Sequence, residues 1–437
     1  MHADDVKALG VLAGTAMAAT TARVEELHDA ILRRSLTGTQ ATSVATIHDG
    51  IAKPVYRSVR AATGALGRAA GLALAQTREP GAAPLADSRR GALMLGALNG
   101  LWGDRLEQDG GSLTPHMALR LHGSDLALDR DSLRAAYPQA TPRLAVFVHG
   151  WCETEGAWEL FGRRPDAPAG TPARTYGSRL EEDLGITPLW LRYNSGLHIS
   201  ENGRRLSALL DEAIAAWPVG VEQVVLIGHS MGGLVLRSAC HYGHAEGASW
   251  TERVRHVFCL ASPHLGSGVE RAANAAGWAL GRVPETRPLA ALLNARSSGV
   301  KDLRYGYVVD EDWDGRDPDA LLEDHSNEIP FLPGANHYFV AATLARDPDS
   351  HLARVVGDLL VGFPSASGHD PRGRHLAFPV DNGHHVPGLN HFHVLNHPAV
   401  YEQLHAWLER DAVGVEAVAA TSGEVPATVV PAQDPDG

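Results

Sequence analysis

From about residue 120 onward, short apolar runs alternate with longer stretches of helical periodicity. Runs of this length are typical of strands that are buried on both faces of a parallel sheet, with crossover helices between them. The five runs are Leu144 to Val148, Pro188 to Arg192, Gln223 to Ile227, His256 to Leu260 and Tyr338 to Ala342. The alternation predicts an α/β fold with a doubly wound, mostly parallel sheet, whose chemistry lies beyond the carboxyl ends of the strands.

Composition limits the partners of such a domain. The chain has 437 residues and a formal net charge of −13, which argues against a nucleic-acid partner. Cys152, Cys240 and Cys259 are too scattered for a disulfide framework or a C-x-x-C metal site, and favour reduced thiols. The apolar stretch from Ala8 to Ala19 is too short for a membrane span and lacks a preceding basic cluster. We therefore expect neither a signal peptide nor a transmembrane helix, and a cytoplasmic location.

Residues 1–100 show helical spacing instead of strand-like runs. Val24, Leu27, Ile31 and Leu32 share one helix face, which predicts an amphipathic N-terminal helix. We favour packing of this helix against the main domain, with peripheral contact to a membrane or lipid surface as the alternative.

The chain divides into three parts on these patterns. An N-terminal helical region is expected over 1–100 and the α/β domain over 120–410, with a last helix from His397 to Arg410. The segment 411–437 is rich in Ala, Val and Pro without sustained periodicity, and we expect a disordered tail there.

The most informative local motif is Gly228-His229-Ser230-Met231-Gly232, which lies between a strand and an apolar helix. The string G-x-S-x-G is weak by itself, but a sharp strand-turn-helix corner is the context that exposes a nucleophilic serine. Ser230 then needs a base within hydrogen-bond reach and an acid that orients the base. We expect its oxyanion hole to combine the N–H of Met231 with that of Trp151 or Gly150, after the strand that ends at Val148.

Three segments together carry a family resemblance: Val148-His149-Gly150, the corner from Gly228 to Gly233, and Ala261-Ser262-Pro263-His264-Leu265-Gly266-Ser267. They resemble serine esterases and lipases of the α/β-hydrolase superfamily, most closely bacterial lipases and the GPI-inositol-deacylase-like (PGAP-like) branch. The resemblance covers about residues 140–410. It implies a serine carboxylic-ester hydrolase that acts through an acyl-enzyme on apolar acyl esters of small-molecule or lipid type, without a cofactor.

The resemblance also implies the other two members of a catalytic triad. Asp358 lies in a segment similar to the family's acid loop, although Leu359 replaces the usual glycine, and Asp381 is the alternative acid. His391 precedes an aromatic residue shortly before the last helix, as the family's base does, and His393 is the alternative base.

Five histidines, at positions 384, 385, 391, 393 and 397, also raise the possibility of a zinc site. We expect no metal, because neither a Cys pair nor H-E-x-x-H accompanies these histidines.

An insertion at about 268–313 has enough apolar surface to cap a pocket. We interpret it as a lid or acyl-binding wall, with a purely structural subdomain as the alternative.

Two other functions remain open on the sequence. The same residues would serve an amidase, a thioesterase or a transacylase, and a non-catalytic binding protein can use the same scaffold.

Overall fold

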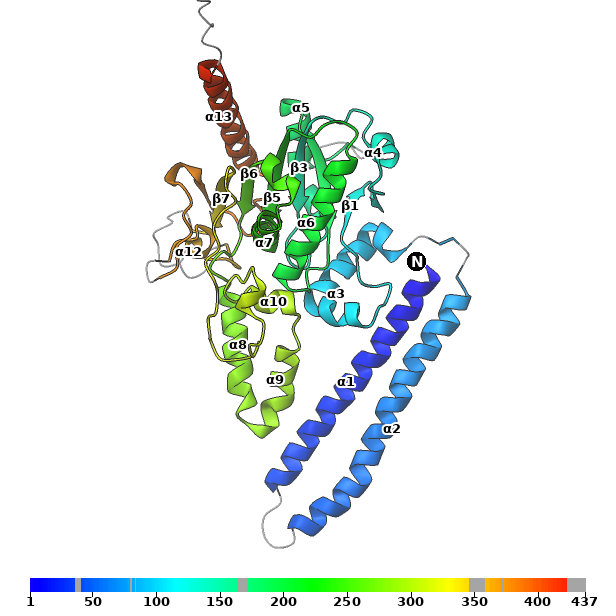
Figure 1. The fold of residues 1–437 in the computed structure, drawn as a ribbon. Coiled ribbons are helices and arrows are strands. Elements are labelled where there is room, and N and C mark those ends of the chain that lie inside the picture. The colour runs from blue at the N-terminus through cyan, green and yellow to red at the C-terminus, as the bar shows by residue number, and fades with distance from the viewer. Residues whose placement is uncertain are drawn as a thin grey trace, which may run out of the picture.

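The computed structural model describes residues 1–35, 41–78, 81–82, 84–163, 171–345, 358–370 and 373–422. An eight-stranded sheet with the order β2-β1-β4-β3-β5-β6-β7-β8 forms its centre (Figure 1). The strands from β4 to β8 in that order are parallel, and β1 is antiparallel to both β2 and β4. The bounds are β1 (Ala118–Leu121), β2 (Ser124–Asp125), β3 (Arg143–Val148), β4 (Thr187–Arg192), β5 (Gln223–His229), β6 (Val254–Leu260), β7 (Asn336–Thr343) and β8 (Gly383–Pro387). The predicted α/β fold with a mostly parallel sheet is confirmed.

All five predicted runs lie within β3 to β7. The three strands that the sequence did not indicate lie at the two ends of the sheet. β2 has only two residues, β1 contains the buried Arg120, and β8 reads Gly-His-His-Val-Pro. β2 and β8 are the edge strands, each paired with a neighbour on one side only, and β1 lies next to the edge between β2 and β4. Strands at or near a sheet edge need no continuous apolar run.

Helices cover both faces of the sheet, as a doubly wound fold requires. In β3, Leu144, Val146 and Val148 pack into a core with α6 and α7, whereas Ala145 and Phe147 pack into a second core with α5 and α13. The helices of this body are α4 (Arg130–Ala136), α5 (Tyr176–Leu184), α6 (Ile199–Ala216), α7 (Met231–Ala245), α12 (Phe363–Ala366) and α13 (Pro398–Ser422), with short 3-10 helices η2 (Glu155–Glu159), η3 (Ser249–Arg253), η5 (Asp310–Asp312) and η6 (Val380–Asn382).

The last helix is longer than the sequence suggested. α13 continues past Arg410, where we placed its end, and reaches Ser422, so part of the expected tail is helical. The added stretch contains four alanines, the residue with the highest helix propensity. The rest of the expected tail, 423–437, lies outside the described residues.

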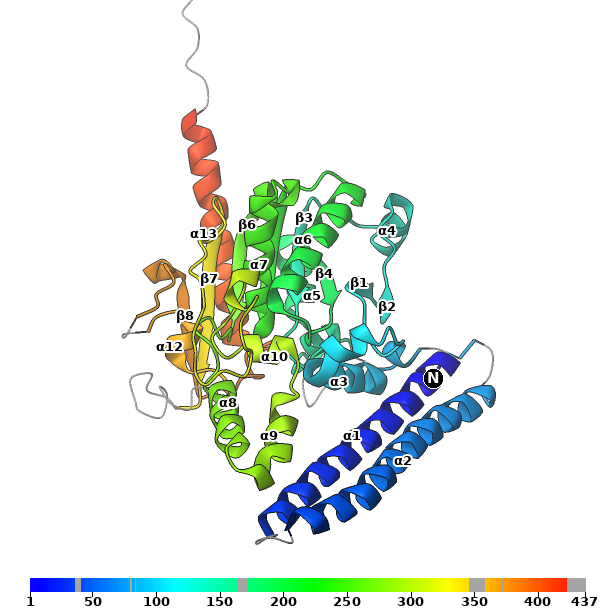
Figure 2. The same cartoon turned by 60° about the horizontal axis from the view of Figure 1, so that its bottom comes forward.

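The first two helices, α1 (Ala3–Ser35) and α2 (Ala41–Gln76), form an antiparallel hairpin that projects from the body (Figures 1 and 2). Their backbones approach closely through glycines: a Cβ on Gly10 would lie 2.5 Å from the Cα of Gly71, and a Cβ on Gly67 would lie 2.5 Å from the Cα of Gly14. Small residues permit this close helix packing.

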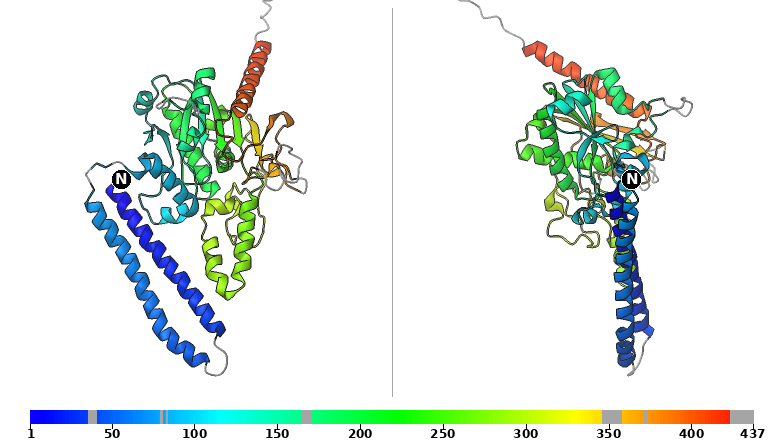
Figure 3. Two further views of the ribbon diagram at one scale, coloured as in Figure 1. Left: turned by 180° about the vertical axis from the view of Figure 1, so that it is seen from behind. Right: turned by 90° about the vertical axis from the view of Figure 1, so that its right-hand side faces the viewer.

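The N-terminal helix packs differently from our expectation, because its main partner is α2 and not the sheet domain. α1 does contact the body, at α9 (Arg287–Asn294) and η4 (Pro284–Thr286). Val24 and Leu27, however, remain 50% and 38% exposed, because the side chains that α1 buries against α2 lie on another face. The two views of Figure 3 show the hairpin extending away from the sheet. None of the described helices combines the length and apolarity that a membrane crossing needs.

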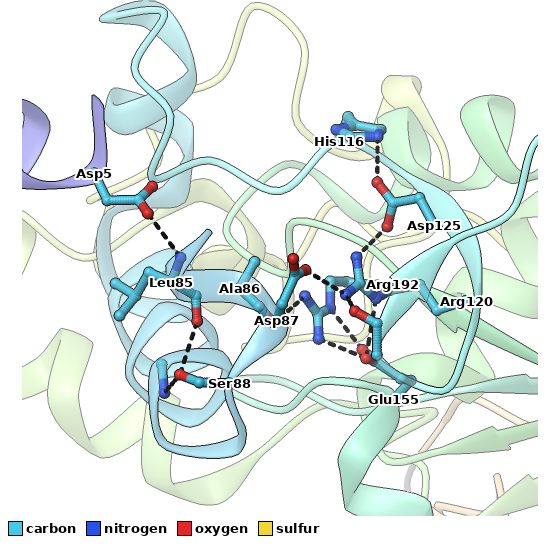
Figure 4. Close-up of polar contacts among 12 residues, drawn as sticks. Asp5, Leu85, Ala86, Asp87, Ser88, His116, Arg120, Asp125, Glu155 and Arg192 are labelled. Atoms are coloured by element: carbon cyan, nitrogen blue, oxygen red, sulfur yellow. Dashed lines mark hydrogen bonds and ion pairs between the residues drawn. The ribbon is translucent and has the colours of Figure 1, made fainter. Parts of the chain in front are cut away.

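Helix α3 (Arg89–Gln108) packs on the sheet domain, so the domain boundary that we expected near residue 100 falls inside it. η1 (Leu85–Asp87), just before α3, is tied to both neighbours (Figure 4). The Leu85 N–H donates to Asp5 of α1 at 2.7 Å, and Arg192 of β4 donates to the Ala86 carbonyl at 3.0 Å. Arg192 also pairs with Glu155 at 2.5 Å. This network joins the N-terminal helices to the edge of the sheet.

The insertion after β6 is helical. It comprises α8 (Gly268–Gly281), η4, α9 and α10 (Ser298–Asp302), and α8 and α9 form a second hairpin that projects on the same side as α1 and α2 (Figure 1).

Candidate active site

Ser230 occupies the corner between β5 and α7. Its backbone has φ 53° and ψ −122°, a conformation that L-residues rarely adopt and that is held here by the surrounding contacts. The Ser230 N–H donates to the Leu260 carbonyl of β6 at 2.8 Å. Gly232 is required because a Cβ there would lie 2.2 Å from the Val148 carbonyl oxygen. The corner therefore fixes Ser230 at the carboxyl end of the central strand, where its side chain is 9% exposed.

Asp358 and His391 form a hydrogen-bonded pair. His391 Nδ1 lies 2.8 Å from Asp358 Oδ2, and both side chains are buried. The other carboxylate oxygen accepts from the N–H groups of Leu360 and Val361 at 3.0 and 2.8 Å. The His391 N–H donates to the Asp358 carbonyl at 3.0 Å. These contacts fix the position of the carboxylate. They leave His391 Nε2 as the ring nitrogen that is available to accept a proton.

The pair lies beside the serine corner. The ring centroid of His391 is 5.0 Å from that of His229, which immediately precedes Ser230. His229 Nε2 is 3.2 Å from the His391 carbonyl oxygen. Within the described residues, no hydrogen bond joins Ser230 Oγ to His391 Nε2. Such contacts are often loose in free enzymes and tighten when substrate binds.

The two alternative residues lie elsewhere. Asp381 is exposed in η6, at the amino end of β8, and so at the opposite end of the sheet from Ser230. His393 is exposed, and its ring packs edge-to-face with that of Phe161, with the two ring centroids 5.0 Å apart. His385 bonds Thr343 at 2.8 Å. The histidine cluster therefore disperses, and among the described residues no three potential ligands lie close enough to hold a metal ion.

The loop after β3 lies against the serine. A Cβ on Gly150 would lie 3.0 Å from Ser230 Cβ. The Gly150 N–H already donates to Glu153 Oε2 at 2.6 Å, and the Cys152 N–H to Ser195 Oγ at 3.2 Å. In the part of the chain that the structure describes, the N–H groups of Trp151 and Met231 have no hydrogen-bond acceptor. Of the two expected alternatives, the Trp151 N–H is thus the one left available.

Helix α3 supports this loop from outside. Trp151 Nε1 donates to the Gly100 carbonyl at 2.7 Å. A Cβ on Gly100 would lie 2.3 Å from Cys152 Sγ, and one on Gly96 would lie 2.9 Å from the Cys152 carbonyl oxygen. Close glycine packing of α3 therefore sets the position of the loop.

Glu153 and His229 form a buried ion pair that the sequence analysis did not find. Glu153 Oε2 lies 3.0 Å from His229 Nδ1 and is the same oxygen that accepts the Gly150 N–H. Because His229 Nε2 faces the His391 carbonyl, the pair connects the β3 loop, the serine corner and the His391 loop. No motif links residues 76 positions apart, so only the fold reveals this contact.

The pair has a defined protonation. Burial disfavours the charge on each residue, but their mutual attraction outweighs burial: the pKa of His229 is raised and the pKa of Glu153 is lowered. The pair contributes stability above the ordinary pKa of Glu, 4.5, and loses it as the pH falls through the lowered Glu153 pKa. It contributes stability below the ordinary pKa of His, 6.5, and loses it as the pH rises through the raised His229 pKa.

We therefore expect Glu153→Gln to lower the free energy of unfolding most between pH 4.5 and 6.5, on the order of 3 kcal/mol, because one partner of a buried pair is removed. The difference from wild type should shrink on both sides of that window. Denaturant unfolding at a series of pH values measures it. A difference that does not change with pH would contradict the ion pair.

Leu359 has a backbone φ of 93°, in the region that favours glycine. Its side chain is 55% exposed, so little packing is lost on truncation. We expect Leu359→Gly to be more stable than Leu359→Ala by about 1 kcal/mol, because only glycine relieves the strain at positive φ. Thermal unfolding of both variants measures this. If alanine were the more stable residue, the backbone beside Asp358 would not be strained.

The parallel sheet with helices on both faces and the serine corner after β5 are similar to those of α/β-hydrolases. Residues 191–313 match the family model described as PGAP1-like alpha/beta domain. This match confirms the resemblance over the serine corner and the Ala261 to Ser267 segment, while Asp358 and His391 lie beyond it.

Several solved structures are similar, and no curated protein sequence matches. The mature lipase BlEst2 of Bacillus licheniformis has 18% identity and a TM-score of 0.38, with 61% of this chain and 91% of that chain covered. Aspergillus fumigatus lipase B has 13% identity and a TM-score of 0.35, with 64% and 57% covered. Phospholipase PlaB of Legionella pneumophila has 14% identity and a TM-score of 0.29, with 52% and 45% covered.

Proposed function

We propose that this protein is a serine hydrolase of carboxylic esters with apolar acyl groups. The observation that carries the proposal is the Ser230 corner with the Asp358–His391 pair packed beside it. A serine at a strained corner, an imidazole and a fixed carboxylate are the parts that nucleophilic acyl transfer requires.

The reaction assigns one task to each group. Ser230 Oγ attacks the ester carbonyl as His391 Nε2 takes its proton, while Asp358 orients and stabilises the imidazolium. The N–H groups of Met231 and Trp151 bind the oxyanion of the tetrahedral intermediate. His391 then donates the proton to the departing alcohol, which leaves Ser230 acylated. A water deprotonated by His391 attacks the acyl-enzyme, and His391 then returns that proton to Ser230 Oγ as the carboxylic acid is released. No cofactor enters these steps.

The preference for apolar acyl groups is supported by the insertion after β6. Trp278, Leu289 and Leu292 on α8 and α9 are 40%, 50% and 59% exposed. The insertion that carries them follows the carboxyl end of β6, which is the end of the sheet at which Ser230 follows β5. We propose that this hairpin forms a wall or lid for the acyl chain.

The test compares three octanoyl substrates with different leaving groups: a p-nitrophenyl ester, a thioester and a p-nitroanilide. We expect the ester to have the highest kcat/KM. No turnover of any substrate would overturn the hydrolase proposal. A preference for the thioester or the anilide would keep the nucleophile and overturn the ester assignment. p-Nitrophenyl acetate, octanoate and laurate then measure the acyl preference, and a highest kcat/KM for acetate would contradict the acyl wall.

A further inference from the structure

A cavity of about 330 Å³ lies between α7, the segment before β7 and the segment before β8. Arg237 and Arg374 both line it. Arg237 follows Ser230 by two helical turns of α7, which is about 10 Å along the helix axis. The cavity is therefore separate from the serine corner.

Arg237 is a buried cation without a direct ion-pair partner among the described residues. Its side chain is 5% exposed, its Nε has no hydrogen-bond partner among those residues, and one terminal nitrogen lies 3.5 Å from His264 Nδ1. Burial lowers the pKa of Arg237 to about 10, so the guanidinium is still charged at neutral pH. Within the described residues no carboxylate forms an ion pair with it. Burying an unpaired charge is costly, which favours a ligand of opposite charge.

In the described part of the chain, no group around Arg237 forms a direct ion pair with it. Burial lowers the pKa of His264 and lowers that of His337 to about 3, so both are neutral at physiological pH. The buried Asp312 carboxylate attracts the Arg237 guanidinium from a longer distance, but its own oxygens accept four hydrogen bonds from Val308, Val309 and Asn327.

Arg374 adds a second cation to the cavity. It donates to the Tyr305 carbonyl at 2.7 Å and lies 3.9 Å from the Asp324 carboxylate, and its Nε has no hydrogen-bond partner among the described residues. Glu328 also lines the cavity but is exposed, so water screens its charge. The inner part of the cavity is therefore electropositive.

Most of the remaining wall is apolar and consists of Ile329, Pro330, Phe331, Leu376 and Ala377. Asn327 and His375 complete the lining. The Phe331 ring lies 6.0 Å from the Arg237 guanidinium, so apolar and cationic surfaces adjoin. A ligand that satisfies both surfaces has an acidic head and an apolar body.

We propose that this cavity binds an amphipathic organic anion, with its carboxylate or phosphate head at Arg237 and Arg374 and its apolar body along Phe331. The proposal stands on the cavity alone and does not depend on the reaction at Ser230.

Titration calorimetry on the full chain tests it with octanoate, octyl phosphate, octanol and inorganic phosphate. We expect saturable binding of octanoate or octyl phosphate, and at least tenfold weaker binding of octanol and of inorganic phosphate, because each presents only half of the recognised ligand. The stronger of the two anions identifies the head group. Absence of saturable binding for both amphipathic anions would overturn the proposal.

Variants then assign the binding to this cavity. Arg237→Met and Arg374→Met should each weaken binding about tenfold or more, since each removes a charge-assisted hydrogen bond. Arg255→Met is the matched control, because Arg255 is exposed on β6 and does not line the cavity. If Arg237→Met does not fold, Arg374→Met decides the question, because that side chain is 21% exposed and tolerates replacement better. Unchanged affinity in a folded variant would place the anion elsewhere, such as the serine site, and overturn the proposal.

Discussion

Ser230→Ala is expected to reduce kcat on a p-nitrophenyl ester by about 10⁴ to 10⁶-fold and to abolish labelling by a fluorophosphonate probe. The reason is that the nucleophile, base and acid act as one unit, so the loss of one removes covalent catalysis. The residual rate would come from the oxyanion donors and substrate binding alone. The fold should persist, because the substitution removes one oxygen atom and keeps the hydrogen bond from the backbone N–H of residue 230 to the Leu260 carbonyl.

Ser238→Ala provides the control for this prediction. Ser238 lies on α7, the helix that follows Ser230, and is buried. Its Oγ has no hydrogen-bond partner among the described residues, so its loss should leave turnover and labelling unchanged. Retention of activity by a folded Ser230→Ala protein would exclude Ser230 as the nucleophile. Equal loss in both variants would attribute the effect to damage of α7.

Asp358→Asn is expected to lower kcat by about 10⁴-fold with little change in stability. Asparagine retains the oxygen that accepts the Leu360 and Val361 N–H groups, so the loop should keep its conformation. Its amide, however, would donate to His391 Nδ1 and force the proton onto Nε2, which could then no longer accept the serine proton. Steady-state kinetics and thermal unfolding separate the two effects.

Asp381→Asn is the matched control, because Asp381 is exposed at the other end of the sheet. We expect wild-type kinetics from it. If Asp381→Asn were the variant that lost activity, the acid assignment would have to be exchanged.

Part of the candidate site could be predicted from local sequence. The corner at Ser230 is visible because a strand, two glycines and a helix follow one another in the chain, and each has a local signature. Asp358 and His391 were found through family resemblance, and their roles stay predictions until the variants are measured. Leu359 lies where the resemblance implies a glycine, and its positive φ is a conformation that favours glycine.

Other features had no local signature. The Glu153–His229 pair, the support of Trp151 by Gly100 and the cavity at Arg237 each join residues from separate elements. The local sequence around a glutamate three residues after a turn, or around an arginine on an apolar helix face, does not indicate which group that side chain will contact.

Apolar periodicity in the sequence by itself determined the order of the five strands β3 to β7 and the helical character of the stretches between them, because the spacing of buried side chains is a local property. Only the tertiary structure decided which loops meet. Placing β3 beside β5, and β7 beside β8, brings the carboxyl ends of distant strands together, and the buried charges that result depend on that placement. Groups that are distant in the sequence attract one another only after folding has brought them together. The spacing of residues along the chain therefore does not show which of them will pair.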